Sequence, residues 1–171
     1  MSDIIETKRL VLKPYSDCDQ ESMIELLTNE KIKETFMIPD FQRRTEVISM
    51  FKKLQQFSHS EDHYERGVYV GQQLIGFLND VEIVADRIEL GYVIHPDYHN
   101  RGYATEALKA SIEHLFQKGF VEIVSGAFVN NKASICVMKK CGMTRIEREE
   151  DICYHNETRH CCYYAIRRKP D

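Results

Sequence analysis

Within this 171-residue chain, the stretch from Ile94 to Ala107 has the residue types and spacing of an anion site. It is polar, it follows a strand-like run, and a long helical pattern comes after it. The first amides of a helix have no partner inside the helix, and the helix dipole adds partial positive charge there. Gly102 lets the backbone approach a ligand closely, and Ala104 keeps the next helical position small. The stretch therefore predicts a site for a phosphate-bearing ligand.

Two common phosphate motifs are missing from the chain. There is no Gly-x-x-x-x-Gly-Lys-Ser/Thr loop, and there is no Gly-x-Gly-x-x-Gly dinucleotide fingerprint. The expected phosphate site must therefore rest on another loop chemistry.

A second group of reactive residue types is sulfur-rich. The six cysteines show no Cys-x-x-Cys spacing and are Cys18, Cys136, Cys141, Cys153, Cys161 and Cys162. Soft ligands gather in Cys153-Tyr-His155 and His160-Cys161-Cys162, where a hairpin could bring two arms together. Adjacent cysteines in a strand point to opposite faces, however, and make a poor chelating pair. We expect reduced, buried thiols beside a polar turn, and no metal.

Composition sets the broad class. The chain is 43% hydrophobic and 29% charged, as in an ordinary globular protein, and its length fits one domain over residues 1–171. A formal charge of −4 argues against a general nucleic-acid partner. No apolar run reaches membrane length, and the start Met1-Ser2-Asp3 lacks the layout of a signal peptide. These observations predict a cytoplasmic protein with no membrane partner.

The elements that must position the anion stretch follow from periodicity. In the first third we expect an edge strand in Glu6–Tyr15, a helix capped by Ser16 or Asp17 and running to about Thr28, a short helix in Glu30–Thr35, and a helix in Arg44–Phe57. Next come three strands forming an antiparallel meander: Gly67–Val70, Leu74–Val84 and Arg87–Ile94.

The second half alternates helices and strands. We expect a helix from about Tyr103 to Gln117, a buried strand in Val121–Phe128 and a helix from about Lys132 to Cys141. Two closing strands are expected in Thr144–Asp151 and Thr158–Arg167. The Val121–Phe128 strand follows Arg87–Ile94 through a helix, so the two should be parallel. The predicted fold class is α/β, with a single mixed, mostly antiparallel sheet and helices on both faces.

Two motifs carry a resemblance to a known family. His99-x-x-Gly102-x-Ala104 resembles the Gln/Arg-x-x-Gly-x-Gly/Ala pyrophosphate loop of the GNAT acetyltransferases, although His99 departs from the usual first residue. The run from Asn131 to Gly142 resembles the Asn-x-x-Ser-x-x-Val-Leu-x-Lys-x-Gly signature of the ribosomal-protein N-acetyltransferase (RimJ/RimL-type) branch. The resemblance covers nearly the whole chain and implies the GNAT fold.

The resemblance also implies a cofactor, acetyl-coenzyme A, and the residues that hold it. Strand residues Tyr92, Val93 and Ile94 would pair with the pantetheine arm, and Asn131 would hydrogen-bond it from the opposite strand end. The loop that would hold the pyrophosphate, mainly through backbone amides, comprises His99, Asn100, Arg101, Gly102, Tyr103, Ala104 and Thr105.

Acetyl transfer to an amine needs a base for the amine and a proton for the departing thiolate. Glu89, in a match to the family's Glu-Ile-Gly-Tyr, is the candidate base, acting directly or through water; the alternative is a solvent-facing carboxylate or one paired with Arg87. The family's usual acid, a tyrosine, is Met138 here. Ser134, one turn earlier, is the candidate acid, unless it only satisfies its own helix backbone.

The resemblance thus implies an N-acetyltransferase whose acceptor is a primary amine, on a small molecule or a protein N-terminus, and which could form a homodimer. The helical offset of Cys136 from Ser134 predicts that Cys136 faces away from the thioester, which favours direct attack by the amine in a ternary complex. A non-catalytic coenzyme A-binding sensor and an unrelated phosphate-binding domain are the competing interpretations.

Overall fold

A computed structural model describes residues 3–169 of the chain. The expected single domain of residues 1–171 includes four terminal residues outside this range, and Met1 and Ser2, used above to judge a signal peptide, are among them. None of the described helices is long and apolar enough to cross a membrane.

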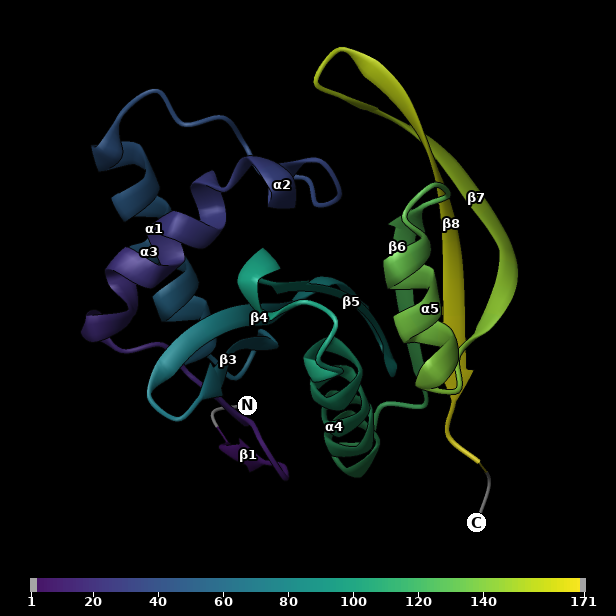
Figure 1. Ribbon diagram of the computed structural model, residues 1–171. Helices are drawn as coiled ribbons and strands as arrows, with labels where there is room; N and C mark the ends of the chain where they lie inside the picture. The colour runs from purple at the N-terminus through teal and green to yellow at the C-terminus, as the bar shows by residue number, and fades with distance from the viewer. Residues whose placement is uncertain (1–2, 170–171) are drawn as a thin grey trace.

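The centre of the molecule is one eight-stranded sheet in the order β1-β2-β3-β4-β5-β6-β8-β7 (Figure 1). Its strands are β1 (Ile5–Glu6), β2 (Val11–Lys13), β3 (Glu65–Val70), β4 (Gln73–Val84), β5 (Arg87–Ile94), β6 (Glu122–Phe128), β7 (Thr144–Tyr154) and β8 (Glu157–Arg167). Only the β5–β6 pair is parallel, and the other six neighbouring pairs are antiparallel. The predicted fold class, meander and parallel crossover are confirmed.

Helices cover both faces of this sheet. They are α1 (Gln20–Thr28), α2 (Glu30–Lys33), α3 (Arg44–Ser58), α4 (Tyr103–Gln117) and α5 (Lys132–Lys140), with short 3-10 turns η1 (Asp17–Asp19) and η2 (Pro96–Tyr98). One core packs α1, α2 and α3 against β3–β5, and a second packs α4 and α5 against the opposite face. Of the two predicted caps, Ser16 is the one used, and it forms a capping box with Asp19 before α1.

The start of the chain differs from the expected single strand. Thr7 turns the chain, because its backbone amide donates to the Leu10 carbonyl (2.9 Å) and its hydroxyl accepts from the Leu10 amide (3.0 Å). Two short strands, β1 and β2, result and pair with each other, with Ile5 opposite Leu12. This local hydrogen bonding overrides the period-2 pattern.

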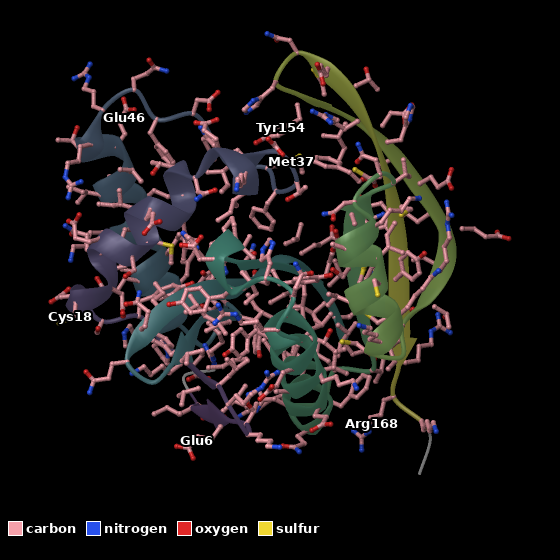
Figure 2. The ribbon with its side chains drawn as sticks, in the orientation of Figure 1. Glu6, Cys18, Met37, Glu46, Tyr154 and Arg168 are labelled. Carbon is pink, nitrogen blue, oxygen red and sulfur yellow. The ribbon has the colours of Figure 1, made fainter. Side chains whose placement is uncertain are left out.

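The last hairpin is longer than expected. Strands β7 and β8 meet at a two-residue turn, His155-Asn156, in which both residues have positive φ (52° and 61°). This geometry matches the right-handed twist of the flanking strands. The tip of the hairpin reaches the loop after α2: the Tyr154 hydroxyl donates to the Phe36 carbonyl (3.2 Å) and accepts from the Ile38 amide (3.4 Å). Figure 2 shows Tyr154 and Met37 close together there.

The sheet forks between β5 and β6. The parallel ladder joins only Arg87–Glu89 to Glu122–Val124, although both strands continue beyond it. At the branch point the buried Ser125 hydroxyl donates to the Leu90 carbonyl (2.7 Å), which satisfies the first β5 carbonyl past the ladder. Beyond Leu90, β5 therefore presents an edge toward β6 that a strand-like ligand could use.

Candidate active site

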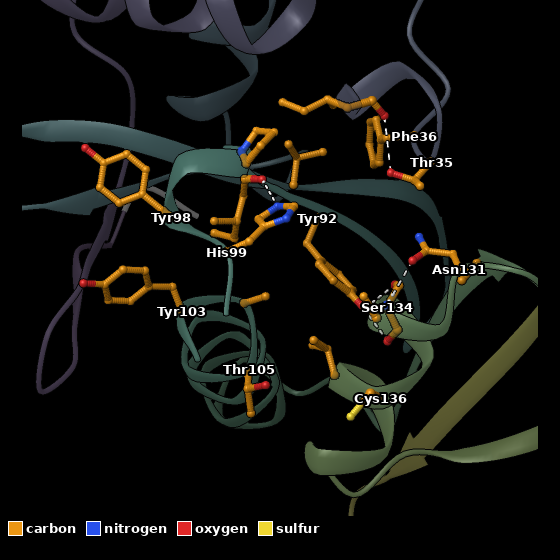
Figure 3. Close-up of a pocket in the computed structure, with 18 of the residues that line it drawn as sticks. Thr35, Phe36, Tyr92, Tyr98, His99, Tyr103, Thr105, Asn131, Ser134 and Cys136 are labelled. Carbon is orange, nitrogen blue, oxygen red and sulfur yellow. Dashed lines mark hydrogen bonds between the residues drawn. The ribbon is translucent and has the colours of Figure 1, made fainter. Parts of the chain in front are cut away.

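A cavity of about 320 Å³ lies at this fork (Figure 3). Its walls come from α2 and the loop after it, from β5 and β6, and from the starts of α4 and α5. Gly91 on β5 and Gly126 on β6 are both in the lining. A β-carbon at Gly126 would lie 2.6 Å from the Tyr163 ring, and one at Gly91 would lie 2.9 Å from Asn79 Oδ1. At both glycines a neighbouring side chain therefore packs directly against the strand backbone.

The anion loop leads from η2 into α4. Gly102, the residue before α4, has φ of 79°, and Asn100 has φ of 60°, so the turn uses the left-handed region twice. The amides of Tyr103, Ala104 and Thr105 begin the helix, where intrahelical acceptors are lacking. These amides and the dipole of α4 face the same cavity, which is the arrangement that binds phosphate.

Arg9 braces this loop from the β1–β2 turn. Its Nη1 donates to the Arg101 carbonyl (2.7 Å), and its Nε and Nη2 bind Glu106 Oε2 on α4 (both 2.7 Å). Its guanidinium also lies over the Tyr103 ring, 4.6 Å from the centroid. The left-handed turn is thus held from outside by Arg9, whose charge is paired with Glu106.

His99 has a structural contact that the motif did not predict. Its Nε2 lies 2.6 Å from the Ile94 carbonyl and, when protonated, donates to it. This bond ties the loop back to the end of β5. It also means that the Ile94 carbonyl already has a donor, so a pantetheine contact at Ile94 would have to use another group.

Two hydroxyl groups meet across the cavity. Tyr92 on β5 points toward α5, and its hydroxyl lies 2.7 Å from Ser134 Oγ and 3.0 Å from the Ser134 carbonyl (Figure 3). Burial raises the pKa of Tyr92, so its hydroxyl stays protonated. Met138, one turn further along α5, is fully buried in the core and does not replace the missing tyrosine of the family.

Asn131 is the N-cap of α5. Its Oδ1 accepts from the Ser134 amide (3.2 Å), which fixes the first turn of the helix. The residue also lines the cavity. With Oδ1 engaged in the cap, a ligand contact would fall to the side-chain amide nitrogen.

Two of the predicted site residues that the structure describes, Glu89 and Arg101, do not line the cavity. Glu89 is 6% exposed, and its Oε2 binds Arg148 Nη1 of β7 at 2.6 Å, so it is neither solvent-facing nor paired with Arg87, the two alternatives to the base role. Arg148 also lies 3.8 Å from the Tyr163 ring centroid. The carboxylate is thus held in a buried ion pair next to the fork.

Cys161 and Cys162 are buried, as expected for the sulfur-rich segments, whereas Cys153 is exposed at the end of β7, contrary to that expectation. All six are free thiols, and no group of three or more potential metal-binding side chains is found within residues 3–169. Cys161 and Cys162 pack into cores on opposite faces, as expected for adjacent strand residues. Burial raises the pKa of Cys141 to about 11.

Cys136 has a place in the cavity wall that its helical offset did not predict. The helical offset predicted that it faces away from the site, yet it is exposed and contributes to the cavity wall. The reason is that the cavity widens around the exposed side of α5 and includes its second turn. Figure 3 shows the sulfur directed away from the Tyr92–Ser134 pair.

The cavity gathers eleven of the predicted site residues: Tyr92, Val93, Ile94, His99, Asn100, Gly102, Tyr103, Ala104, Thr105, Asn131 and Ser134. The motifs did not identify the wall formed by Lys31, Thr35 and Phe36, or the side-chain role of Tyr92. Gly91 inside a strand pattern was the available signal, because a strand glycine often marks close approach of a ligand.

The forked sheet, the anion loop at the start of α4 and the facing hydroxyls together define the acyltransferase class of fold. Within that class, the chain belongs to the GNAT acetyltransferase family: residues 9–144 match the model of the acetyltransferase (GNAT) domain. The protein is an acetyltransferase by this membership.

Known relatives agree with the assignment. The chain is 25% identical over 167 residues to the uncharacterized N-acetyltransferase YoaA of Bacillus subtilis, covering 92% of each chain. A GNAT-family acetyltransferase structure from Bacillus anthracis superposes with a TM-score of 0.83, at 24% identity over 96% of this chain and 98% of that one. A RimL ribosomal-protein alpha-N-acetyltransferase, solved with coenzyme A, gives a TM-score of 0.85 at 16% identity over 96% and 98%.

Proposed function

We propose that the protein transfers the acetyl group of acetyl-coenzyme A to a primary amine by direct attack in a ternary complex. The observation that carries the proposal is the Tyr92–Ser134 hydroxyl pair, because it stands in the same cavity as the anion loop. A site that only bound a phosphorylated ligand would not need a proton donor in the same cavity as its phosphate loop.

The residues around the cavity fit the cosubstrate. The start of α4 and its left-handed turn suit the pyrophosphate, and the open edge of β5 suits the amides of the pantetheine arm. When bound, acetyl-coenzyme A would supply the activated thioester. Asn131 and the residues Tyr92 to Ile94 would hold the arm between α5 and β5.

Ser134 would give a proton to the departing thiolate, and Tyr92 would orient the Ser134 hydroxyl and replace its proton. This assignment needs Tyr92 to donate its one proton to Ser134 Oγ, at 2.7 Å, in place of the Ser134 carbonyl, at 3.0 Å. Proton donation at thiolate departure matters only in the transition state, so the pair would serve turnover more than binding.

Glu89 would take the proton of the amine through water. It lies outside the cavity wall and is paired with Arg148, so direct contact with the amine is not available to it. The pair keeps the carboxylate near the fork in a fixed orientation. A water-mediated route needs only hydrogen-bond continuity across the fork.

Steady-state kinetics with a panel of primary amines tests the proposal. Release of free coenzyme A that depends on both acetyl-coenzyme A and an amine is the expected result, with intersecting double-reciprocal plots. Glu89→Gln should shift the pH–rate profile, and Asp86→Asn, an exposed change in the preceding turn, is the control. Tight binding of coenzyme A without transfer to any amine would favour the non-catalytic sensor instead.

A further inference from the structure

The wall of the active-site cavity carries positive charge and no negative charge. In the part of the chain that the structure describes, Lys31 and Lys140 are its only residues with a fixed charge, and no aspartate or glutamate lines it. Coenzyme A accounts for a cation beside its phosphates, but it brings no negative charge to its thioester end. A cation at that end of the cavity is therefore available to the other substrate.

Lys140 lies at the end of the cavity that contains the anion loop. It is the last residue of α5, and the thiol of the next residue, Cys141, donates to the Thr105 carbonyl on α4 (3.5 Å). Thr105 belongs to the helix start that suits the pyrophosphate. The charge of Lys140 is thus placed for the phosphates of coenzyme A.

Lys31 belongs to the wall at the other end, which is formed by α2 and the turn after it. In this wall Phe36 packs against Gly91, since a β-carbon at Gly91 would lie 3.1 Å from the Phe36 ring. Gly91 precedes Ile94 by three residues on β5, which is about 10 Å from the strand end where the anion loop begins. Figure 3 shows Phe36 across the cavity from Thr105. The α2 wall therefore borders the acetyl end of the cavity.

Helical spacing turns Lys31 toward the cavity. Four residues of this segment line it: Lys31, Ile32, Thr35 and Phe36. They occupy positions i, i+1, i+4 and i+5, which share one face of a helix. The Phe36 amide donates to the Ile32 carbonyl (2.9 Å), so the helical turn continues through the segment. Lys31 is exposed and lies on the face that borders the cavity.

No carboxylate pairs with Lys31 among residues 3–169. Two nearby acids are taken by a different lysine, because Lys33 binds Asp40 at 2.7 Å and Glu30 at 3.5 Å. Glu34, three residues after Lys31, forms no ion pair with it and does not line the cavity. The ammonium group of Lys31 thus keeps its charge and its donors available beside the cavity.

The acids on the other arm of the fork are also paired. Glu89 and Glu150 both bind Arg148, at 2.6 and 3.0 Å. A polycation would therefore meet no carboxylate in the described cavity wall, whereas an anion at the acetyl end would meet Lys31.

We propose that the acceptor is a primary amine that also carries a carboxylate, and that Lys31 binds this carboxylate. The amine faces the thioester while the carboxylate lies against α2. A free amino acid and an acidic side chain near a protein N-terminus share this chemistry. The inference rests on the proposed function, to which it adds the charge class of the acceptor and a residue that determines specificity.

Matched acids and amides test the charge selection on the full chain. Each ω-amino acid from β-alanine to ε-aminocaproate is paired with its carboxamide, and the acid-to-amide ratio of kcat/KM is measured. The basicity of the amine differs within a pair, but this difference cancels when the same pair is compared between protein variants. For the pair that the wild type acetylates best, Lys31→Gln should lower the ratio about fivefold, and Lys31→Glu should lower it further.

Two other lysines provide the controls. Lys139→Gln removes the same charge from an exposed position of α5 outside the cavity wall, and it should keep the wild-type ratio. Lys140→Gln should weaken coenzyme A binding in calorimetry and also keep the ratio. Added salt should lower the wild-type ratio toward that of Lys31→Gln, because it screens the ion pair.

Peptides separate the two sources of the carboxylate. The peptides Ser-Asp-Ala-Ala and Ser-Asn-Ala-Ala form a matched pair with a free N-terminus. A Lys31-dependent preference for the aspartyl peptide alone identifies a protein N-terminus, and one for the ω-amino acids alone identifies a free amino acid. Either result supports the proposal.

A ratio that Lys31→Gln leaves unchanged in both series would overturn the proposal while leaving the proposed function intact. Weaker coenzyme A binding in Lys31→Gln with an unchanged ratio would also overturn it, because Lys31 would then serve the cosubstrate. If no amine is acetylated, the proposed function fails, and calorimetry of the same acids and amides with saturating coenzyme A decides. Acid binding that Lys31→Gln weakens supports the subsite, and equal or absent binding overturns it.

Discussion

The hydroxyl of Tyr92 lies 2.7 Å from Ser134 Oγ, although the two residues are 42 positions apart in the chain. The contact spans the fork of the sheet, since Tyr92 belongs to β5 and Ser134 to the first turn of α5. The Ser134 amide takes part in the helix cap, and its hydroxyl in addition contacts Tyr92. Its hydroxyl has a protonated neighbour whose raised pKa keeps it a donor.

Removing either hydroxyl should lower turnover rather than cofactor affinity. We expect Ser134→Ala to reduce kcat about tenfold to a hundredfold, and Tyr92→Phe to reduce it by up to about tenfold, because the proton is needed only as the thiolate departs. Calorimetry should show coenzyme A affinity within about twofold of wild type. Ser111→Ala, a buried serine in the middle of α4, is the control. Unchanged kcat in both site variants would remove the pair from the mechanism.

Gly102→Val should abolish coenzyme A binding. The residue has φ of 79°, where a β-carbon costs about 1–2 kcal/mol, and that β-carbon would lie 3.3 Å from Arg9 Nη2. The displaced loop could no longer present its amides. Gly119→Val is a matched control: Gly119 also has positive φ (102°), at the other end of α4, and has open space around it. If both variants lose similar stability but only Gly102→Val loses coenzyme A affinity, the loop assignment is confirmed. Equal coenzyme A affinities in the two variants would contradict it.

Arg148→Gln should destabilise the protein by about 1–3 kcal/mol, because it leaves the buried Glu89 carboxylate without its cation. Arg145→Gln, which breaks an exposed ion pair with Glu149 on the same strand, should cost less than about 0.5 kcal/mol. Urea unfolding measures both. In the double variant Glu89→Gln/Arg148→Gln part of the loss should be recovered. Equal costs for the two arginines would mean that the Glu89 pair is effectively solvated.

Glu65 should make stability depend on pH. Its pKa rises from 4.5 to about 8 on folding, so the native state binds more protons than the unfolded state between these values. The contribution is fully present below about pH 4.5 and is lost as pH rises through 8, with a slope of at most about 1.4 kcal/mol per pH unit. Urea unfolding from pH 5 to 8 should show a decline that Glu65→Gln flattens.

Gln keeps an acceptor for the Tyr15 hydroxyl, so the Glu65→Gln variant should fold. Glu113→Gln, on the exposed side of α4, serves as the control and should leave the slope unchanged. Parallel pH profiles for wild type and Glu65→Gln would show that Glu65 titrates normally in the folded protein.

Cys136→Ala should remain active, because the thiol is directed away from the Tyr92–Ser134 pair even though it lines the cavity. An acyl-enzyme route would need an activated thiolate next to the thioester. Cys141 is no substitute, since burial raises its pKa to about 11. Parallel double-reciprocal lines together with an acetylated cysteine found by mass spectrometry would establish the covalent route instead.

The sequence by itself determined the elements that local chemistry specifies. The capping box at Ser16, the cap at Asn131 and Gly102 at the start of α4 depend on a few neighbouring residues, so their helices were predictable to within a residue or two. The anion loop was equally local. Its residues supply their own backbone amides, and the family resemblance rests on the same short runs.

Only the tertiary structure decided which distant side chains meet. In the sheet, β8 lies between β6 and β7. The fork opens because β5 pairs with β6 over three residues only. No periodicity encodes where a ladder stops. The Tyr92–Ser134, Glu89–Arg148 and Tyr154–Phe36 contacts each join elements 42 to 118 positions apart. Such contacts depend on the summed packing of the two cores, which is why the sequence did not identify Arg148 as the partner of Glu89 or the wall formed by Lys31, Thr35 and Phe36.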